Sequence, residues 1–389
     1  MKIINIGGNN MSRVTVDVNP DVLQWAIDKK GKGDIKNKFP KIDEWLNGIS
    51  KPTIHQLENF AKYVSVPFGY LLLSKPPVEN APLTHFRTLP GSNENISSEL
   101  YETIMELKRR QSWMREYLID NGYKPLTFVG SKINNKSVKI IVEDIKSTLK
   151  LPHNWAEKQP NWQAALEFLQ KKVEEIGIVV IKSGIVGNNT HRKLNVSEFR
   201  GFVLVDEYVP FIFINAADSK SAQMFTIAHE LAHIWLGISA SFDLHNLQPA
   251  KDEIEQICDK VAAEFLVPED SLRNSLNEIK IQLQSDIYKF LSRKFKVSEI
   301  VCARRLLDLG LITKDVFSEF YNNYQKKEKT TNQEGGNFYA TLNLRLGRRF
   351  SETVIQAVKE GKLLYKEAYR LTGCYGKTFD DFMLKKYSV

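Results

Sequence analysis

The chain has 389 residues, of which 42% are hydrophobic, 11% aromatic and 26% charged. This composition supplies enough apolar side chains for buried cores in two or three domains, and it excludes a wholly disordered or collagen-like chain. No apolar run reaches the roughly 18–20 residues of a membrane span, and the N-terminus lacks the apolar stretch of a secretion signal. The 3 cysteines lie far apart without CxxC spacing. We therefore expect a cytoplasmic protein with reduced thiols and no membrane partner.

The net charge of +8 is concentrated at the two ends of the chain. Residues 1–75 carry 11 Lys/Arg against 7 Asp/Glu, and residues 335–389 carry 10 against 5, so the middle is close to neutral. Basic ends favour nucleic acid or an acidic protein as a partner, and a charge of this size also serves solubility.

Short helical patterns fill the first block of the chain, before a proline-rich stretch. Apolar residues at i, i+4 spacing follow the cap residue Asn19, and the pattern at 42–46 ends in Asn-Gly, a helix C-cap signal. Thr53 caps an amphipathic helix over 54–64. These features predict an all-α N-terminal domain over residues 1–76.

In the middle of the chain the period of the apolar residues changes. An amphipathic helix over 162–176 is followed by three predicted strands, at 178–181, 202–205 and 211–214, and then by a run of helices. This order predicts an α+β domain over residues 77–320. The last of the three strands is expected to be an edge strand that could pair with an extended peptide.

The C-terminal part of the chain divides into a linker and a small module. Residues 321–336, YNNYQKKEKTTNQEGG, are polar and charged, which predicts a flexible linker. Residues 337–389 are basic, with helices expected over 350–359 and 365–371. The fold class we predict is α+β in the centre, flanked by the all-α N-terminal domain and this small helical C-terminal module.

The motif HELAH at residues 229–233 is the strongest chemical signal. Histidines four residues apart lie on one face of a helix, so His229 and His233 can bind one metal ion at about 2.0–2.1 Å. Glu230 lies beside that face, where its carboxylate can take a proton from water on the metal. The motif also arises by chance, so a third ligand from a second element must support it.

Several downstream residues could supply this third ligand. They are His245, Asp252, Glu253, Glu255, Asp259 and Glu264. The segment IEQICDKVAAEFLVP has helical apolar spacing and places Glu255 and Asp259 one turn apart, a pattern typical of gluzincins. We favour Glu255 as the third ligand and Asp259 as the acceptor of a hydrogen bond from a metal-bound imidazole. The alternative is that both are ordinary exposed acids.

These residues resemble the ImmA/IrrE family of metallo-endopeptidases, in its longer members with an N-terminal XRE-type helix-turn-helix-like domain. The resemblance rests on FTIAHELAHIWLG, on the acid thirteen residues before Pro268, on FRGFVLVDEYVPFIFINAADS, on HFRTLPG and on KIDEWLNGISKPTIHQLENFAKYVSVPFGYLLL. It covers most of residues 16–310. It implies a gluzincin-like core that binds Zn²⁺ through His229, His233 and Glu255, with Glu230 as the general base.

The resemblance also implies a function. Some members of the family cleave XRE-type repressors in stress-response or mobile-element settings, and others lie beside toxin genes and resemble antitoxins. We expect a zinc endopeptidase that hydrolyses a peptide bond in a specific regulatory protein, such as an XRE-type repressor. Its partner would be that substrate or a cognate toxin. The alternative is an antitoxin or transcription regulator that binds its toxin and DNA without proteolysis.

Two imidazoles and one carboxylate leave a fourth position open, which is the arrangement of a catalytic zinc site. Zinc lowers the pKa of bound water, and Glu230 can accept the proton and deliver it to the leaving amine. Arg200, Tyr208 and His245 are candidates, by position only, to stabilise the oxyanion. For each of these three residues a structural role is the alternative.

Two interpretations of the N-terminal domain stay open. In one, residues 42–47 form a DNA recognition helix with lysines near phosphates. These lysines are Lys36, Lys38, Lys41 and Lys51. In the other, the domain binds protein, because Asp43 and Glu44 at the front of that helix would oppose phosphate contact. We favour DNA binding or a DNA-linked interaction.

Overall fold

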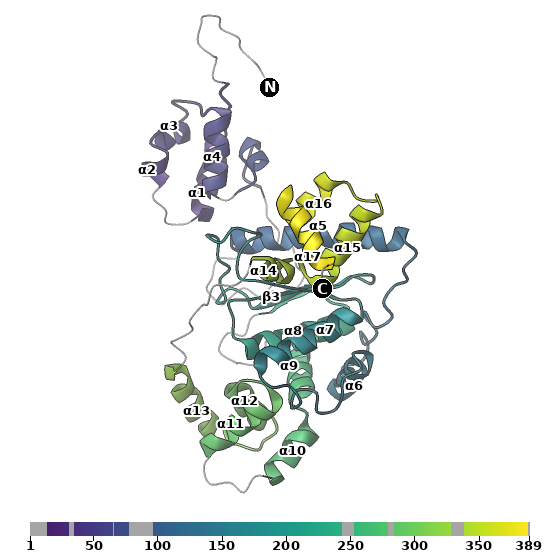
Figure 1. Cartoon of the computed structure of the whole chain (residues 1–389). Coiled ribbons are helices and arrows are strands. Elements are labelled where there is room, and N and C mark those ends of the chain that lie inside the picture. Colours follow the sequence, from purple (N-terminus) through teal and green to yellow (C-terminus); the bar gives the residue numbers. More distant parts are fainter. Residues whose placement is uncertain are drawn as a thin grey trace, which may run out of the picture. The chain divides into compact units, whose positions relative to one another are not determined.

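The computed structural model describes residues 14–30, 35–64, 66–77, 96–242, 253–278, 284–327 and 338–387. The chain divides into two compact units. One takes in Met1–Pro82 and Gly91–Glu102, and the other takes in Leu83–Pro90 and Thr103–Val389. Figure 1 labels the α-helices of both units. None of the described helices combines the length and the apolar character that crossing a membrane requires.

The N-terminal unit has a small helical core of its own. Its elements are α1 (Pro20–Lys30), α2 (Ile35–Lys38), α3 (Ile42–Leu46), α4 (Ile54–Val64) and the 3-10 helix η1 (Phe68–Leu72). α4 begins with a capping box, in which the Thr53 hydroxyl accepts from Gln56 N–H and the Gln56 side chain accepts from Thr53 N–H. The apolar stripe of α4 is buried, and the ring of Phe60 makes edge contacts with Phe39 and Trp45.

A four-stranded sheet forms the centre of the second unit. Its strands are β1 (Val179–Ser183), β2 (Gly201–Leu204), β3 (Phe211–Asn215) and β4 (Ala240–Phe242), in the order β1-β3-β2-β4. β1 and β3 are parallel, and β2 is antiparallel to both of its neighbours. Every residue of β1, β2 and β3 is buried, as expected when helices cover both faces of a sheet. The predicted α+β fold class is confirmed.

The prediction that residues 211–214 form an edge strand is wrong. β3 lies inside the sheet, where Ile212 pairs with Val180 of β1 on one side and with Val203 of β2 on the other. Its unbroken apolar sequence FIFI is typical of an interior strand buried on both faces. The strand at the edge beside β2 is β4, whose three residues are too few to give a periodic signal in the sequence.

Helices cover both faces of this sheet. The helices of the central part are α5 (Ser98–Asp120), α6 (Val138–Thr148), α7 (Trp162–Glu175), α8 (Lys220–Leu236), α9 (Glu253–Leu266), α10 (Glu269–Glu278), α11 (Gln284–Phe295), α12 (Glu299–Asp308) and α13 (Lys314–Lys327). Four more follow: α14 (Phe338–Leu346), α15 (Arg348–Lys359), α16 (Tyr365–Thr372) and α17 (Lys377–Tyr387). α7 and α8 pack on one face of the sheet, and α14 and α15 lie on the opposite face with α5 (Figure 1).

α13 extends into the segment that was predicted to be a linker. The helix runs to Lys327, so the first part of 321–336 is helical and not flexible, and 328–337 lies outside the described residues. Aromatic residues one turn apart explain the difference, since the rings of Phe320 and Tyr324 contact each other with a centroid distance of 5.7 Å. Such pairs stabilise a helix even where the composition is mostly polar.

The C-terminal helices share a hydrophobic core with the sheet. Phe350 in α15 is fully buried and meets the rings of Phe211 in β3 and Trp113 in α5 edge-on, at centroid distances of 6.0 and 5.8 Å. Arg110 in α5 is 5% exposed and donates from Nε to the Leu371 carbonyl at 2.8 Å. The module is therefore docked on the face of the sheet opposite α8.

Replacing Phe350 with alanine tests this docking. We expect Phe350→Ala to lower the free energy of unfolding of the central unit by about 3–5 kcal/mol, because it opens a cavity between α15, β3 and α5. Urea unfolding monitored by circular dichroism measures the change. Phe290→Ala is the control, since Phe290 is 41% exposed and should cost much less. An unchanged transition for Phe350→Ala would mean that the module folds without the sheet.

Candidate metal centre

α8 carries the HELAH motif through the most deeply buried part of the chain. The helix begins at the N-cap Ser219, whose hydroxyl accepts from Ala222 N–H, and it ends at Gly237, which adopts a left-handed conformation with φ of 73°. Every residue of 223–236 is buried. The apolar members of this segment hold the helix against the sheet and α9, so the polar members are buried with them.

Side chains of three residues on α8 and α9 bring their metal-binding atoms close together. His229 Nε2 lies 3.1 Å from His233 Nε2 and 3.1 Å from Glu255 Oε2, and His233 Nε2 lies 3.4 Å from Glu255 Oε1. Each imidazole Nε2 has either one proton or one lone pair, so hydrogen bonds cannot satisfy all three contacts at once. Around one tetrahedral ion with bonds of about 2.0–2.1 Å, neighbouring ligand atoms lie roughly 3.3 Å apart. The observed spacing fits such an ion.

α9 places its acids as the sequence pattern predicts. The apolar stripe of this helix is buried, and Glu255 is only 8% exposed although it is charged. Asp259 Oδ1 lies 3.1 Å from His229 Nδ1, on the side of the imidazole away from Glu255. The two atoms lie at ion-pair distance, and their alignment is not that of a hydrogen bond. Asp259 can thereby orient the ring of His229.

A thiol, which the sequence analysis did not single out, also lies close to the histidines. Donor atoms of His229, His233 and Cys258 all lie within 4.8 Å of one another, and Cys258 is fully buried. The signal was present in the sequence, since Cys258 follows Glu255 by three residues and so faces the same side of α9. Of the two α9 residues, Glu255 is the donor already at ligand spacing, and Cys258 lies within reach.

Glu230 is buried beside this cluster without a hydrogen-bonding partner. Its side chain is fully buried, and among the described residues neither carboxylate oxygen has a hydrogen-bond partner. Burial raises the pKa of Glu230 well above its ordinary value, while His229 lowers the pKa and Glu255 raises it further. A carboxyl group in this environment holds a proton more tightly than an exposed one does.

The ionisable groups of the cluster compensate one another. Burial alone would lower the pKa of His229, but Asp259 and Glu255 raise it to about 10. Burial would likewise raise the pKa of Glu255, and the two imidazoles instead bring it below its usual range. Because an imidazole must be neutral to bind a metal, a cation at this site would displace the proton of His229.

Gly201 in β2 provides the space for α8 and Glu230. A Cβ atom at this position would lie 2.4 Å from Thr226 Cγ2 and 2.7 Å from the Phe213 carbonyl oxygen, and 3.6 Å from Glu230 Oε1. Real Cβ atoms do not approach other atoms so closely, so only glycine fits here. This close approach could not be predicted from the sequence, because it depends on the packing of β2 against α8.

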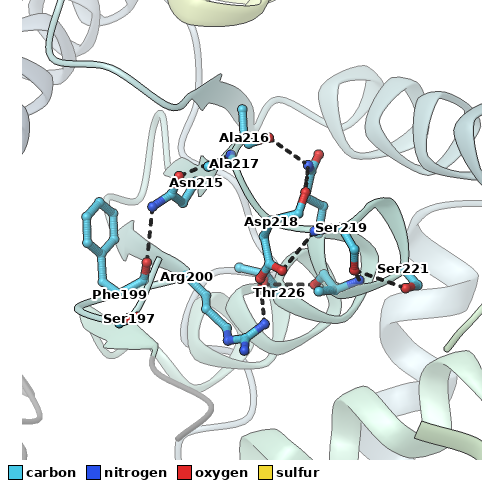
Figure 2. Close-up of polar contacts among 12 residues, drawn as sticks. Ser197, Phe199, Arg200, Asn215, Ala216, Ala217, Asp218, Ser219, Ser221 and Thr226 are labelled. Carbon is cyan, nitrogen blue, oxygen red and sulfur yellow. Dashed lines mark hydrogen bonds and ion pairs between the residues drawn. The ribbon is translucent and has the colours of Figure 1, made fainter. Parts of the chain in front are cut away.

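A network of polar contacts fixes the turn from β3 into α8, as Figure 2 shows. Arg200 Nη1 lies 2.6 Å from Asp218 Oδ2, while the other oxygen of Asp218 accepts from Ser219 N–H at 2.8 Å. The Gln223 side chain donates to the Asp218 carbonyl at 2.7 Å, and that of Asn215 donates to the Phe199 carbonyl at 3.3 Å. These contacts position the start of the HELAH helix.

Two of the three residues considered for oxyanion stabilisation have other contacts in the structure. Arg200 is paired with Asp218 in the turn network, and the ring of Tyr208 lies 5.3 Å from the guanidinium of Arg115. His245 lies outside the described residues. The contacts of Arg200 and Tyr208 are those of the structural role that was considered as the alternative to oxyanion stabilisation.

The lysines expected near DNA make contacts within the N-terminal unit. Lys36 pairs with Asp43 at 2.9 Å, Lys51 pairs with Asp17 at 2.5 Å, and Lys38 Nζ lies 4.7 Å from the centre of the Tyr63 ring. The pairs Lys36–Asp43 and Lys51–Asp17 are exposed, and such ion pairs are weak enough to exchange for a phosphate. DNA contact by these lysines and by Lys41 stays a prediction.

The close approach at Gly201 can be tested by a single methyl group. We expect Gly201→Ala to lower the free energy of unfolding by about 1–3 kcal/mol, because the added Cβ forces β2 away from α8. Gly184→Ala is a matched control in the same unit, since its Cβ would meet its nearest neighbour at an ordinary 3.5 Å. Thermal or urea unfolding compares the two. Equal effects would contradict the tight contact at Gly201.

Two parts of the chain match known protein families. Residues 346–385 match a domain of unknown function (DUF8813), which corresponds to the docked C-terminal helices. No curated protein matches the chain. Residues 173–307 match the IrrE N-terminal-like domain of the peptidase M78 family, and this range contains the whole sheet with α8 and α9. The part of the chain that carries His229, Glu230, His233 and Glu255 is therefore similar to the M78 peptidase family.

Proposed function

We propose that this protein is a zinc-dependent endopeptidase of the gluzincin type, which hydrolyses a peptide bond in a specific regulatory protein. One observation carries the proposal. The Nε2 atoms of His229 and His233 and the carboxylate of Glu255 converge at 3.1–3.4 Å, beside the buried carboxyl of Glu230. This is the donor set of a catalytic zinc site, with two imidazoles, one carboxylate and a base at the same point.

His229, His233 and Glu255 would hold the ion, which when bound supplies Lewis acidity to water and to the peptide carbonyl. Glu230 accepts the proton of the attacking water and then donates it to the nitrogen of the leaving amine. Its burial favours acceptance of the proton, because burial raises the pKa of this carboxyl. Asp259 holds the ring of His229 in the orientation in which Nε2 faces the other two donors.

An extended substrate would bind along β4. β1, at the opposite edge of the sheet, packs against α14 and α15, and Gly347 lies so close to Val179 that a Cβ there would meet its Cγ1 at 2.8 Å. β4 forms the other edge, next to β2, and directly follows the HELAH helix in the chain. A peptide that adds to an edge strand gains backbone hydrogen bonds without regard to its sequence. Specificity would then come from contacts elsewhere, for which the N-terminal unit is our candidate.

The base variant Glu230→Gln tests the proteolytic function. We expect it to retain about one zinc per chain, because the three donors are intact, and to lose peptidase activity, because an amide cannot accept the proton. Metal content is measured by atomic emission, and cleavage by the intact mass of candidate regulators coexpressed with either form. His229→Ala is the metal-free control.

The outcomes of this comparison separate two functions. Cleavage by the unmodified protein and not by Glu230→Gln supports the peptidase. A stable complex that forms with both variants and is never cleaved would support the alternative, an antitoxin or regulator that acts by binding. An XRE-type repressor and a toxin encoded nearby are the two coexpression partners that we would test first.

The positioning role of Asp259 has its own test. We expect Asp259→Asn to weaken zinc binding by roughly 10–100-fold, the usual effect of losing a charged partner of a ligand imidazole. Competition with a chromophoric chelator measures the affinity. Glu253→Gln is a control on the same helix, because its side chain is 71% exposed and pairs with Lys136. If the two variants bind zinc equally well, Asp259 does not support the site.

A further inference from the structure

The buried thiol of Cys258 lies close to the two histidines of the candidate metal site. It is fully buried on the face of α9 that carries Glu255, three residues earlier. Its sulfur belongs to a group with donor atoms of His229 and His233 in which every separation is within 4.8 Å. Independently of the thiol, the two imidazoles and Glu255 already stand at ligand spacing, and the unpartnered, fully buried carboxyl of Glu230 points to a site at this place.

The distance between sulfur and nitrogen is compatible with a common ion. With zinc–sulfur bonds of about 2.3 Å and zinc–nitrogen bonds of about 2.0–2.1 Å, a tetrahedral site separates sulfur from nitrogen by roughly 3.5 Å. The separation of at most 4.8 Å between the sulfur and each histidine donor exceeds this value by little more than 1 Å at most. Thiolate is also a soft ligand that zinc accepts readily, so the chemistry favours this contact.

The other two cysteines of the chain show what an ordinary buried thiol looks like here. Cys302 and Cys374 are also buried, and burial raises the pKa of each thiol. Neither belongs to a group of metal-binding side chains among the described residues. They are therefore controls for Cys258, because they are the same residue type and are buried but lie outside that group.

We propose that Cys258 binds the metal together with His229, His233 and Glu255, and that this closes the site in a resting state. A catalytic zinc site needs one position for water, whereas four protein ligands give the closed coordination of a structural site. The peptidase would then act only when the thiol leaves the ion. This inference rests on the metal centre of the proposed function and adds a condition to its activity.

Cobalt substitution of the full-length protein tests the ligand directly. Co²⁺ bound to a thiolate gives a sulfur-to-metal charge-transfer band in the near ultraviolet, separate from the visible ligand-field bands that any tetrahedral Co²⁺ site shows. We expect both sets of bands in the unmodified protein and in Cys302→Ser and Cys374→Ser. Cys258→Ser should lose the charge-transfer band and keep the ligand-field bands. Its zinc affinity should fall by more than about tenfold, since even losing an indirect partner of a ligand costs this much.

Each outcome of this experiment decides the proposal. Ligand-field bands without a charge-transfer band in the unmodified protein would overturn it and leave the metal centre intact. A charge-transfer band that persists in Cys258→Ser would overturn it as well. Absence of any cobalt spectrum in the unmodified protein would reject the metal centre of the proposed function together with this inference. The spectrum of the unmodified protein decides the case even if a variant does not fold.

Closure of the site has a second measurement. Acetohydroxamate binds only where a metal has a position free of protein ligands, and it shifts the ligand-field bands when it does. We expect it to shift the spectrum of Cys258→Ser at a lower concentration than that of the unmodified protein. Equal concentrations for both would contradict a closed resting state.

Discussion

The central unit depends on the burial of four ionisable side chains between α8 and α9. His229, Glu230 and His233 are fully buried, and Glu255 is 8% exposed. Such groups are costly to bury unless opposite charges compensate them. In the proposed metal centre both imidazoles would be neutral, and a divalent cation would compensate the negative charge of the Glu255 carboxylate. The contact between the helices is thus as much an electrostatic requirement as a packing arrangement.

The sheet and the turn before α8 supply the precision that this cluster needs. Gly201 lets β2 approach α8 more closely than any side chain would allow, next to Glu230. The pair Arg200–Asp218 and the side chain of Gln223 hold the first turn of the helix. Both sets of contacts hold α8 in place. The relative positions of Glu230, His229 and His233 are therefore fixed by the fold.

The sequence predicted what depends on local periodicity and spacing. The spacing of the two histidines and the acid Glu255 on a second amphipathic helix follow from patterns within single helices. The α+β class follows from the order of the predicted elements. Asp259 lies beside His229, 3.1 Å from its Nδ1 atom. The interior place of β3 could not be predicted in this way, because it depends on the parallel pairing with β1, which is distant in sequence. Gly201 was missed for the same reason, since its close contacts exist only where β2 meets β3 and α8.

The C-terminal module packs against the central sheet, although it lies beyond the matched range 173–307. Phe350 fills the face of β3 that α8 leaves uncovered, and Glu174 of α7 accepts from Arg348 N–H at the start of α15. A sheet whose strands are buried on both faces needs such a cover, because β3 would otherwise expose apolar side chains to water. Part of the basic charge of the module serves internal pairs such as Arg348–Glu352. The docking of the module on the sheet gives it a structural role that does not depend on its net positive charge.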